Sequence, residues 1–153
     1  MSNKPHISLA DETLSIASPI SNVFAFLSNH QNYVRWYPGV IAVTSGDGLP
    51  QGAIGKVYNE TLRLPSGRHQ AFEIKVVESR APDLFMTEGA LAPIHPRMEI
   101  RLTAKTAQET LLSLKFFSRS QSVLGRLLIR ALVRRAVRRQ SQVGLRKLKT
   151  LLE

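Results

Sequence analysis

The sequence predicts an α+β fold, with a curved antiparallel sheet of about seven strands, two short helices after the first strand and one long C-terminal helix. Two observations lead to this prediction. Between residues 40 and 118, six segments with strand character are separated by short turns, as in an antiparallel meander. Residues 120–152 then contain no proline and change to helical periodicity. Strands and helices are therefore segregated along the chain.

The N-terminal part of the chain predicts one strand and two short helices. Leu14 and Ile16 alternate with polar residues, which is typical of a strand. Ser18 and Pro19 are favoured at the N-cap and at the first position of a helix, and apolar residues follow at helical spacing. The predicted elements are a strand over 7–17 and helices over 19–28 and 30–36.

The middle of the chain predicts the rest of the sheet. Turns that contain glycine or proline bound the segments, and the alternation is clearest in RMEIRLTAK and ETLLSLKFFS. A curved sheet around one helix leaves space between them, which is a natural ligand cavity. The predicted strands span 40–45, 57–64, 68–79, 84–91, 97–105 and 109–118.

Length and composition fit one domain over residues 1–153 with a sizeable core. The absence of cysteine excludes disulfides, thiolate metal sites and a cysteine nucleophile. The four histidines lack helical metal-pair spacing and the phosphate-binding glycine motifs are missing, so we expect no metal and no cofactor. The N-terminus lacks the apolar segment of a signal peptide, and no apolar run reaches the length of a membrane span, so we expect a cytoplasmic protein.

The segment SIASPISNVFAFLSNHQNYVRWYPGV, residues 15–40, resembles the opening of the START-like polyketide cyclase/dehydrase superfamily (SRPBCC). In that family a strand ends in small-x-Pro, and a Val-Phe helix and an Asn-Tyr-x-x-Trp-x-Pro helix follow. The segment LRKLKTLLE, residues 145–153, is similar to the family's long final helix. The resemblance implies a helix-grip fold with a hydrophobic cavity between sheet and helix. It also implies ligands such as lipids, sterols, quinones or polyketides, and in some members an aromatase or cyclase activity.

Side chains alternate between the two faces of a strand, and this selects candidate pocket residues. The expected lining combines the apolar faces of the predicted strands with an aromatic residue at the end of the second short helix. One of these faces also carries a tyrosine and a glutamate. The candidate pocket residues are Trp36, Tyr58, Glu60, Phe72, Ile74, Met98, Ile100, Leu114 and Phe116.

Two functions fit such a pocket. The first is non-enzymatic binding or transport of a hydrophobic small molecule such as a lipid, a quinone or a polyketide. The alternative is a cyclase or dehydratase, with Glu60 as general acid–base, Tyr58 as hydrogen-bond donor and Glu88 as a weaker candidate carboxylate. Two simpler interpretations stay open, namely that Glu60 points to solvent and that Trp36 only fills the gap between helix and sheet.

The C-terminal segment carries most of the net charge of +10, because residues 119–153 hold ten basic residues and one acidic residue. Three interpretations remain open: a solvated outer face, a surface that docks on an anionic membrane with leucines inserted, and an interaction module for nucleic acid or an acidic protein. Nucleic acid is disfavoured because the helix lacks base-stacking aromatic residues. The candidate basic surface consists of Arg126, Arg130, Arg134, Arg135, Arg138 and Arg139.

Overall fold

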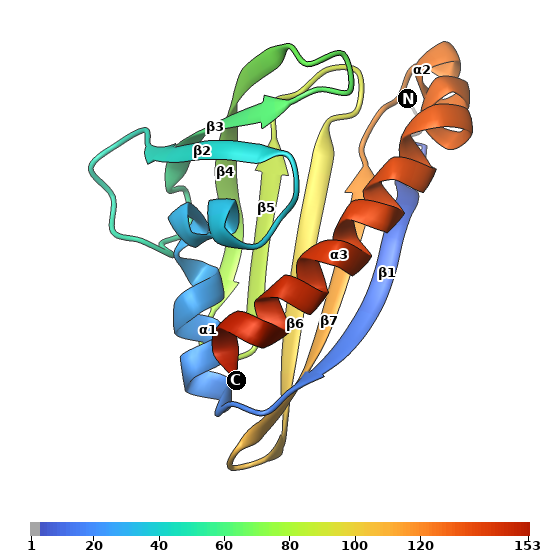
Figure 1. The fold of residues 1–153 in the computed structure, drawn as a ribbon. Coiled ribbons are helices and arrows are strands. Elements are labelled where there is room, and N and C mark those ends of the chain that lie inside the picture. The colour runs from blue at the N-terminus through green and yellow to red at the C-terminus, as the bar shows by residue number, and fades with distance from the viewer. Residues whose placement is uncertain (1–3) are drawn as a thin grey trace.

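Seven antiparallel strands form one curved sheet whose concave face holds the long C-terminal helix, as Figure 1 shows for the computed structural model. The structure describes residues 4–153. Residues 1–3, part of the stretch expected to lack a signal peptide, lie outside the described residues. The spatial order is β1-β7-β6-β5-β4-β3-β2, so β1 and β2 are the edges. The strands are β1 (Ile7–Ile16), β2 (Val40–Ser45), β3 (Val57–Arg63), β4 (His69–Arg80), β5 (Leu84–Gly89), β6 (Pro96–Thr106) and β7 (Glu109–Ser118).

The helices follow the predicted order, and the α+β helix-grip architecture is confirmed. Two short helices connect β1 to β2, and the C-terminal helix consists of three consecutive parts, of which the middle one is a π-helical turn. The helices are α1 (Ile20–Ser28), the 3₁₀ helix η1 (His30–Arg35), α2 (Val123–Leu128), the π-helical η2 (Ile129–Val133) and α3 (Arg134–Leu152). None of the described helices is both long enough and apolar enough to cross a membrane.

Two helix starts differ from the sequence prediction. Pro19 occupies the N-cap of α1 in place of Ser18, whose carbonyl oxygen accepts a hydrogen bond from Thr110 Oγ1 at 2.8 Å. This bond ties the turn before the helix to β7. The C-terminal helix begins at Val123 instead of 120, because Ser122 Oγ caps it by accepting a hydrogen bond from the Gly125 amide at 3.2 Å.

The C-terminal half of α3 packs closely on the rest of the protein. Leu145 and Leu148 are buried, and Gly144 faces Trp36. A Cβ atom at position 144 would lie 3.2 Å from the carbonyl oxygen of Trp36 and 3.3 Å from its ring. A glycine lets the helix approach the segment after η1 this closely without displacing these neighbours. The N-terminal half of α3 is mostly exposed.

We predict that Gly144→Leu lowers the free energy of unfolding by about 1–3 kcal/mol, because the larger side chain overpacks the contact with Trp36. Arg146→Leu is the matched control, since Arg146 is exposed on the same helix. That change is expected to alter stability by less than about 0.5 kcal/mol. Urea denaturation measures the free energy of unfolding of both variants. Equal values for the two would contradict the close contact at Gly144.

Candidate functional site

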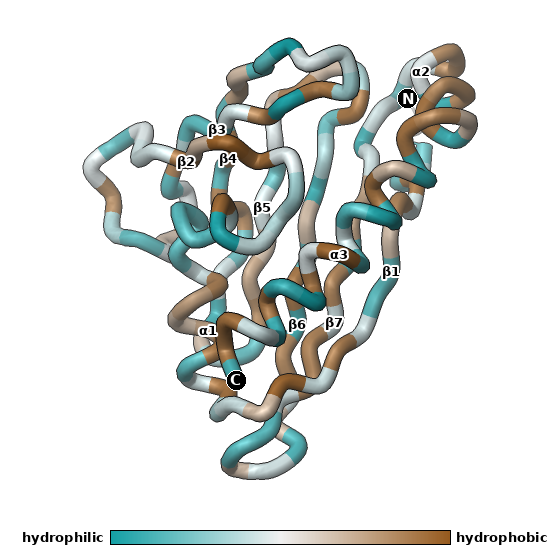
Figure 2. Tube along the Cα trace, viewed as in Figure 1, coloured by the Kyte–Doolittle hydropathy of each residue, from teal (hydrophilic) through white to brown (hydrophobic). Residues whose placement is uncertain are grey.

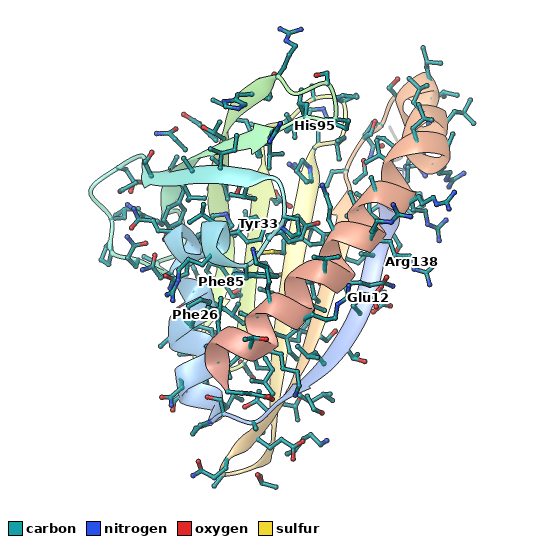
Figure 3. The ribbon with its side chains drawn as sticks, viewed as in Figure 1. Glu12, Phe26, Tyr33, Phe85, His95 and Arg138 are labelled. Carbon is teal, nitrogen blue, oxygen red and sulfur yellow. The ribbon has the colours of Figure 1, made fainter. Side chains whose placement is uncertain are left out.

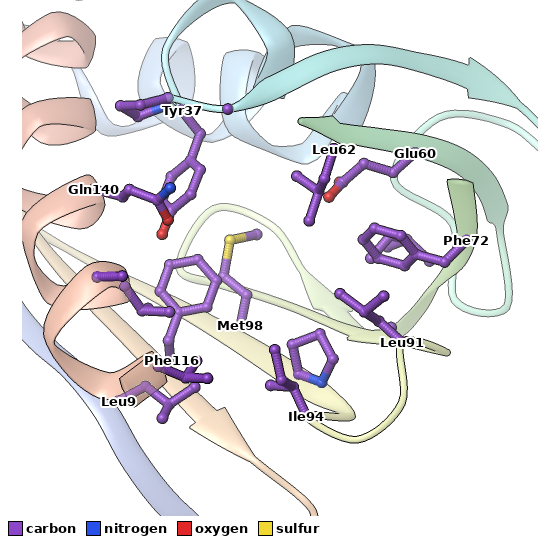
Figure 4. A pocket seen from close by; sticks show the side chains of 18 of the residues that line it. Leu9, Tyr37, Glu60, Leu62, Phe72, Leu91, Ile94, Met98, Phe116 and Gln140 are labelled. Carbon is purple, nitrogen blue, oxygen red and sulfur yellow. The ribbon is translucent and has the colours of Figure 1, made fainter. Parts of the chain in front are cut away.

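A cavity of about 400 Å³ lies between the concave face of the sheet and the N-terminal half of the C-terminal helix (Figure 4). Its wall is mainly apolar and is built by β1, β3 to β7, η1, η2, α3 and the loop between β5 and β6. This volume lies in the range of small-molecule binding pockets. The cavity is therefore the candidate functional site.

The mouth of the cavity lies where its lining residues are exposed. Leu132 and Ala136 form one rim on the helix, and Arg63 at the end of β3 and Pro65 after it form the opposite rim. The cavity therefore opens between the start of α3 and the end of β3. The deeper wall consists of buried strand residues.

Five predicted pocket residues lie on this wall, and strand register explains why. Thr87, Met98 and Phe116 are direct neighbours across β5, β6 and β7, so their side chains point to the same face. The same holds for Glu60 and Phe72 across β3 and β4. The predicted residues on the wall are Glu60, Phe72, Ile74, Met98 and Phe116.

Ile100 and Leu114, both predicted for the pocket, are buried in the core outside the cavity. They pair with each other across β6 and β7. In the sheet this pair lies two residues away from the pair formed by Met98 and Phe116. Helix α1 packs against β6 and β7. Alternation correctly places these two side chains on the concave face, but it does not show how far along that face the cavity extends.

Trp36 and Tyr58 also lie in the core and not on the cavity wall. Trp36 packs edge-on against Tyr33 and Tyr37 and meets α3 at Gly144, so it fills the gap between helix and sheet. The hydroxyl of Tyr58 donates a hydrogen bond to Gln51, and its ring packs against His30. Tyr58 is therefore not placed to donate a hydrogen bond to a ligand in the cavity.

Glu60 and His30 form a buried pair on the cavity wall. Their exposed fractions are 3 % and 2 %, and Glu60 Oε1 lies 2.9 Å from His30 Nε2. Figure 4 shows Glu60 reaching towards the cavity beside Leu62. A buried carboxylate needs such a partner. The pair can share one proton, so it can donate a hydrogen bond or a proton to a bound molecule, or accept one from it.

An aromatic stack connects this pair to the helix side of the cavity. The ring centroids of His30 and Tyr33 are 4.7 Å apart, and those of Tyr33 and Tyr37 are 4.8 Å apart. Burial raises the pKa of Tyr33 well above its ordinary value, and the nearby Tyr37 and Glu60 raise it further. Burial also raises the pKa of Tyr37, although a hydrogen bond with Ser141 opposes this effect. Both hydroxyls are neutral at physiological pH.

Glu88, the weaker candidate carboxylate, does not belong to this site. It follows Thr87 on β5 and therefore points to the opposite face of the sheet. There its carboxylate lies 2.7 Å from Arg97 and 3.6 Å from Arg119. These ion pairs give Glu88 a structural role on the convex face.

The sequence interpretation missed His30 as a site residue. The helical spacing of histidines tests only for a metal pair, whereas His30 pairs with a carboxylate 30 positions away in the chain. One signal was present: His30, Tyr33 and Tyr37 recur at i, i+3 and i+7, which places them near one face of a short helix. Gln140 on α3 is a further polar wall residue that was not predicted.

The predicted basic surface is mostly exposed along the outer side of the C-terminal helix. Arg138 lies 3.9 Å from Glu12 of β1, and Figure 3 shows these two side chains near each other. Arg126 is fixed by hydrogen bonds to the carbonyl oxygens of Pro5 and Ser120, at 2.7 and 3.3 Å. The other four arginines are exposed to solvent. They are Arg130, Arg134, Arg135 and Arg139.

Comparison with protein families gives a match over nearly the whole chain. Residues 10–153 match the model described as "Polyketide cyclase / dehydrase and lipid transport". A search of curated proteins gave no match.

Solved structures share the fold at low sequence identity. The ZhuI aromatase/cyclase from Streptomyces sp. R1128 superposes with a TM-score of 0.72 at 18 % identity, over 97 % of this chain and 93 % of that one. Ara h 8.0201 superposes with a TM-score of 0.67 at 12 % sequence identity, over 93 % of this chain and 95 % of that one. The di-domain aromatase/cyclase StfQ of the steffimycin biosynthetic pathway superposes with a TM-score of 0.68 at 14 % sequence identity. The match covers 93 % of this chain but only 49 % of StfQ. At these identities the likeness shows the fold alone.

We predict that Tyr33 and Tyr37 stay protonated in the folded protein well above pH 10 and that the pKa of Tyr58 is also raised. Burial raises the pKa values of Tyr33, Tyr37 and Tyr58, so the folded state favours their neutral forms. Their contribution to stability is complete below the unfolded pKa of about 10 and is lost as the pH rises through the folded values. Tyrosinate absorbance should therefore appear together with loss of the circular dichroism signal.

The control for this titration is the protein in concentrated guanidinium chloride, where all three tyrosines should ionise near pH 10. Ionisation of all three near that pH with the fold intact would contradict the buried aromatic stack.

Proposed function

Since this chain belongs to the polyketide cyclase/dehydrase and lipid transport family, we propose that it binds or carries a mostly apolar small molecule of the lipid, quinone or polyketide type. The observation that most supports this proposal is the apolar cavity of about 400 Å³ between the sheet and the C-terminal helix. Protein cores are otherwise packed with few voids larger than a water molecule. A single domain over residues 1–153 and a cytoplasmic location stay predictions.

The wall residues supply both affinity and orientation in this proposal. Apolar ligand surface that leaves water contributes about 25 cal/mol per Å². Phe72, Met98 and Phe116 offer such contact area deep in the cavity. Glu60 with His30 on one side and Gln140 on the other are the polar groups that can fix the position of a hydroxyl or carbonyl group on the ligand.

We predict that the protein isolated gently from its own host carries a lipophilic compound that native mass spectrometry detects and solvent extraction releases. Val137→Trp should reduce the retained fraction by about tenfold or more, because Val137 lines the cavity and a larger side chain would occupy it. Val143→Trp, more exposed on the same helix, is the control and should retain the compound. An unliganded mass for the wild type, or equal retention by both variants, would contradict the proposal.

A second candidate function is a cyclase or dehydratase. The observation that favours it is the buried pair of Glu60 and His30 on the cavity wall, since a carrier needs no group able to move a proton. In this proposal Glu60 acts as the general acid–base and His30 holds or relays its proton. Loss of such a group typically slows a reaction by about 10²–10⁴-fold.

The two functions predict different compounds in a Glu60→Gln variant. A dehydratase with this change should be isolated with a precursor that is heavier by one water than the compound in the wild type. A carrier should hold the same compound in both proteins. Glu88→Gln is the matched control, because Glu88 lies on the opposite face of the sheet. Mass spectrometry of the extracts measures the difference, and identical compounds would remove the dehydratase role of Glu60.

A further inference from the structure

The first turns of the C-terminal helix expose an unusual number of apolar side chains. Figure 2 shows α2 largely in the hydrophobic colour at one end of the molecule. Single exposed apolar residues are normal on a protein surface, but a contiguous group marks an interaction site. We call this group the leucine stripe. Its members are each between 46 % and 70 % exposed, and they are Val123, Leu124, Leu127, Leu128 and Leu132.

The buried positions of this segment show that the leucine stripe faces away from the protein. Gly125 and Ile129 are buried and are one helical turn apart, so they define the side that packs on the core. Leu124, Leu127 and Leu128 follow the i, i+3, i+4 spacing of a second helix face. This face is apolar where a helix exposed only to water would be polar.

The charged residues of the helix that carries the leucine stripe are all positive up to residue 152. Residues 119–152 contain no acidic residue. Arg130 and Arg134 lie within and directly after the π-helical turn, are exposed, and form no ion pair with another described residue. Exposed leucines flanked by unpaired arginines are the composition of a helix that lies in a membrane interface.

The leucine stripe reaches the mouth of the cavity. Leu132 belongs to the stripe and also to the cavity rim, and the next residue, Val133, lines the cavity. A surface that covers the stripe therefore also faces the cavity opening. An apolar molecule could then pass between that surface and the cavity without crossing bulk water.

We propose that α2 and η2 dock on the surface of an anionic lipid bilayer, with the leucine stripe inserted between lipids and Arg130 and Arg134 at the phosphate groups. A second copy of this chain is a poorer occupant, because a two-fold contact would bring the same arginines together. Nucleic acid would pair with the arginines but would leave the leucines exposed. The docking does not depend on the proposed ligand, so an experiment can contradict the docking proposal without contradicting the proposed function, and the reverse.

The test of the charges uses vesicle co-sedimentation of the full chain. Vesicles of phosphatidylcholine mixed with phosphatidylglycerol should bind the protein, and vesicles of phosphatidylcholine alone should bind it at least about tenfold more weakly. Arg130→Glu/Arg134→Glu should weaken binding to the mixed vesicles by about tenfold or more. The control is Arg146→Glu/Lys147→Glu, an equal charge change at exposed positions about 20 Å further along the helix. That distance exceeds the Debye length of about 10 Å, so the control should bind like the wild type.

The test of the leucines uses the same assay. Leu124→Ser/Leu127→Ser should weaken binding about tenfold or more, because less apolar surface is buried in the lipid. The control is Leu49→Ser/Ile54→Ser, which removes two exposed apolar side chains from the connection between β2 and β3. Circular dichroism should show all four variants folded, since every changed residue is exposed.

Three results would overturn the docking proposal. The first is no sedimentation with the mixed vesicles, or equal sedimentation with both kinds. The second is a dimer in light scattering that the Leu124→Ser/Leu127→Ser variant loses, since the leucine stripe would then be a self-interface. The third is tight binding to duplex DNA that only the arginine variant loses. A protein that sediments but carries no compound would contradict the proposed function and leave the docking intact.

Discussion

The contact between Gly144 on α3 and Trp36 determines how the helix lies against the sheet. Because glycine has no side chain, the C-terminal half of the helix comes close to Trp36 and Pro38, directly after η1. Leu145 and Leu148 then fill the concave face at that end. A straight helix cannot follow a curved and twisted sheet along its whole length. The N-terminal half therefore stands away from the sheet, and the cavity is the space that remains.

The polar pair in this cavity is an energetic burden that packing alone does not explain. Removing two polar, ionisable side chains from water costs free energy, and their mutual contact offsets only part of this cost. In other proteins, replacing a buried ion pair by well-packed apolar residues of similar volume often leaves stability unchanged or raises it. Glu60 and His30 lie side by side on an otherwise apolar wall. A role towards a bound molecule accounts for their presence better than a structural one.

Local sequence patterns were sufficient for the fold but only partly for the site. The alternation along β3, β4, β6 and β7 placed Glu60, Phe72 and Met98 on the concave face, where the structure has them. The same rule put Ile100 into the pocket, although it lies in the packed core, because alternation gives the face and not the depth. The partnership with His30 joins residues from η1 and β3, and no local pattern encodes such a distant contact.

The cavity and the leucine stripe both reduce stability or solubility, and they lie at the same end of the helix. The residues that line an apolar cavity make fewer dispersion contacts with one another than the residues of a packed core. Exposed leucines leave apolar surface in water that a polar residue would not. Leu132 belongs to both features, since it is exposed on the helix and also forms the cavity rim. The cavity and the exposed leucines would need separate explanations if they lay in different parts of the molecule. The proposed docking would account for both features, because a bilayer surface over the stripe would remove the leucines from water and would be a source of the proposed apolar ligand.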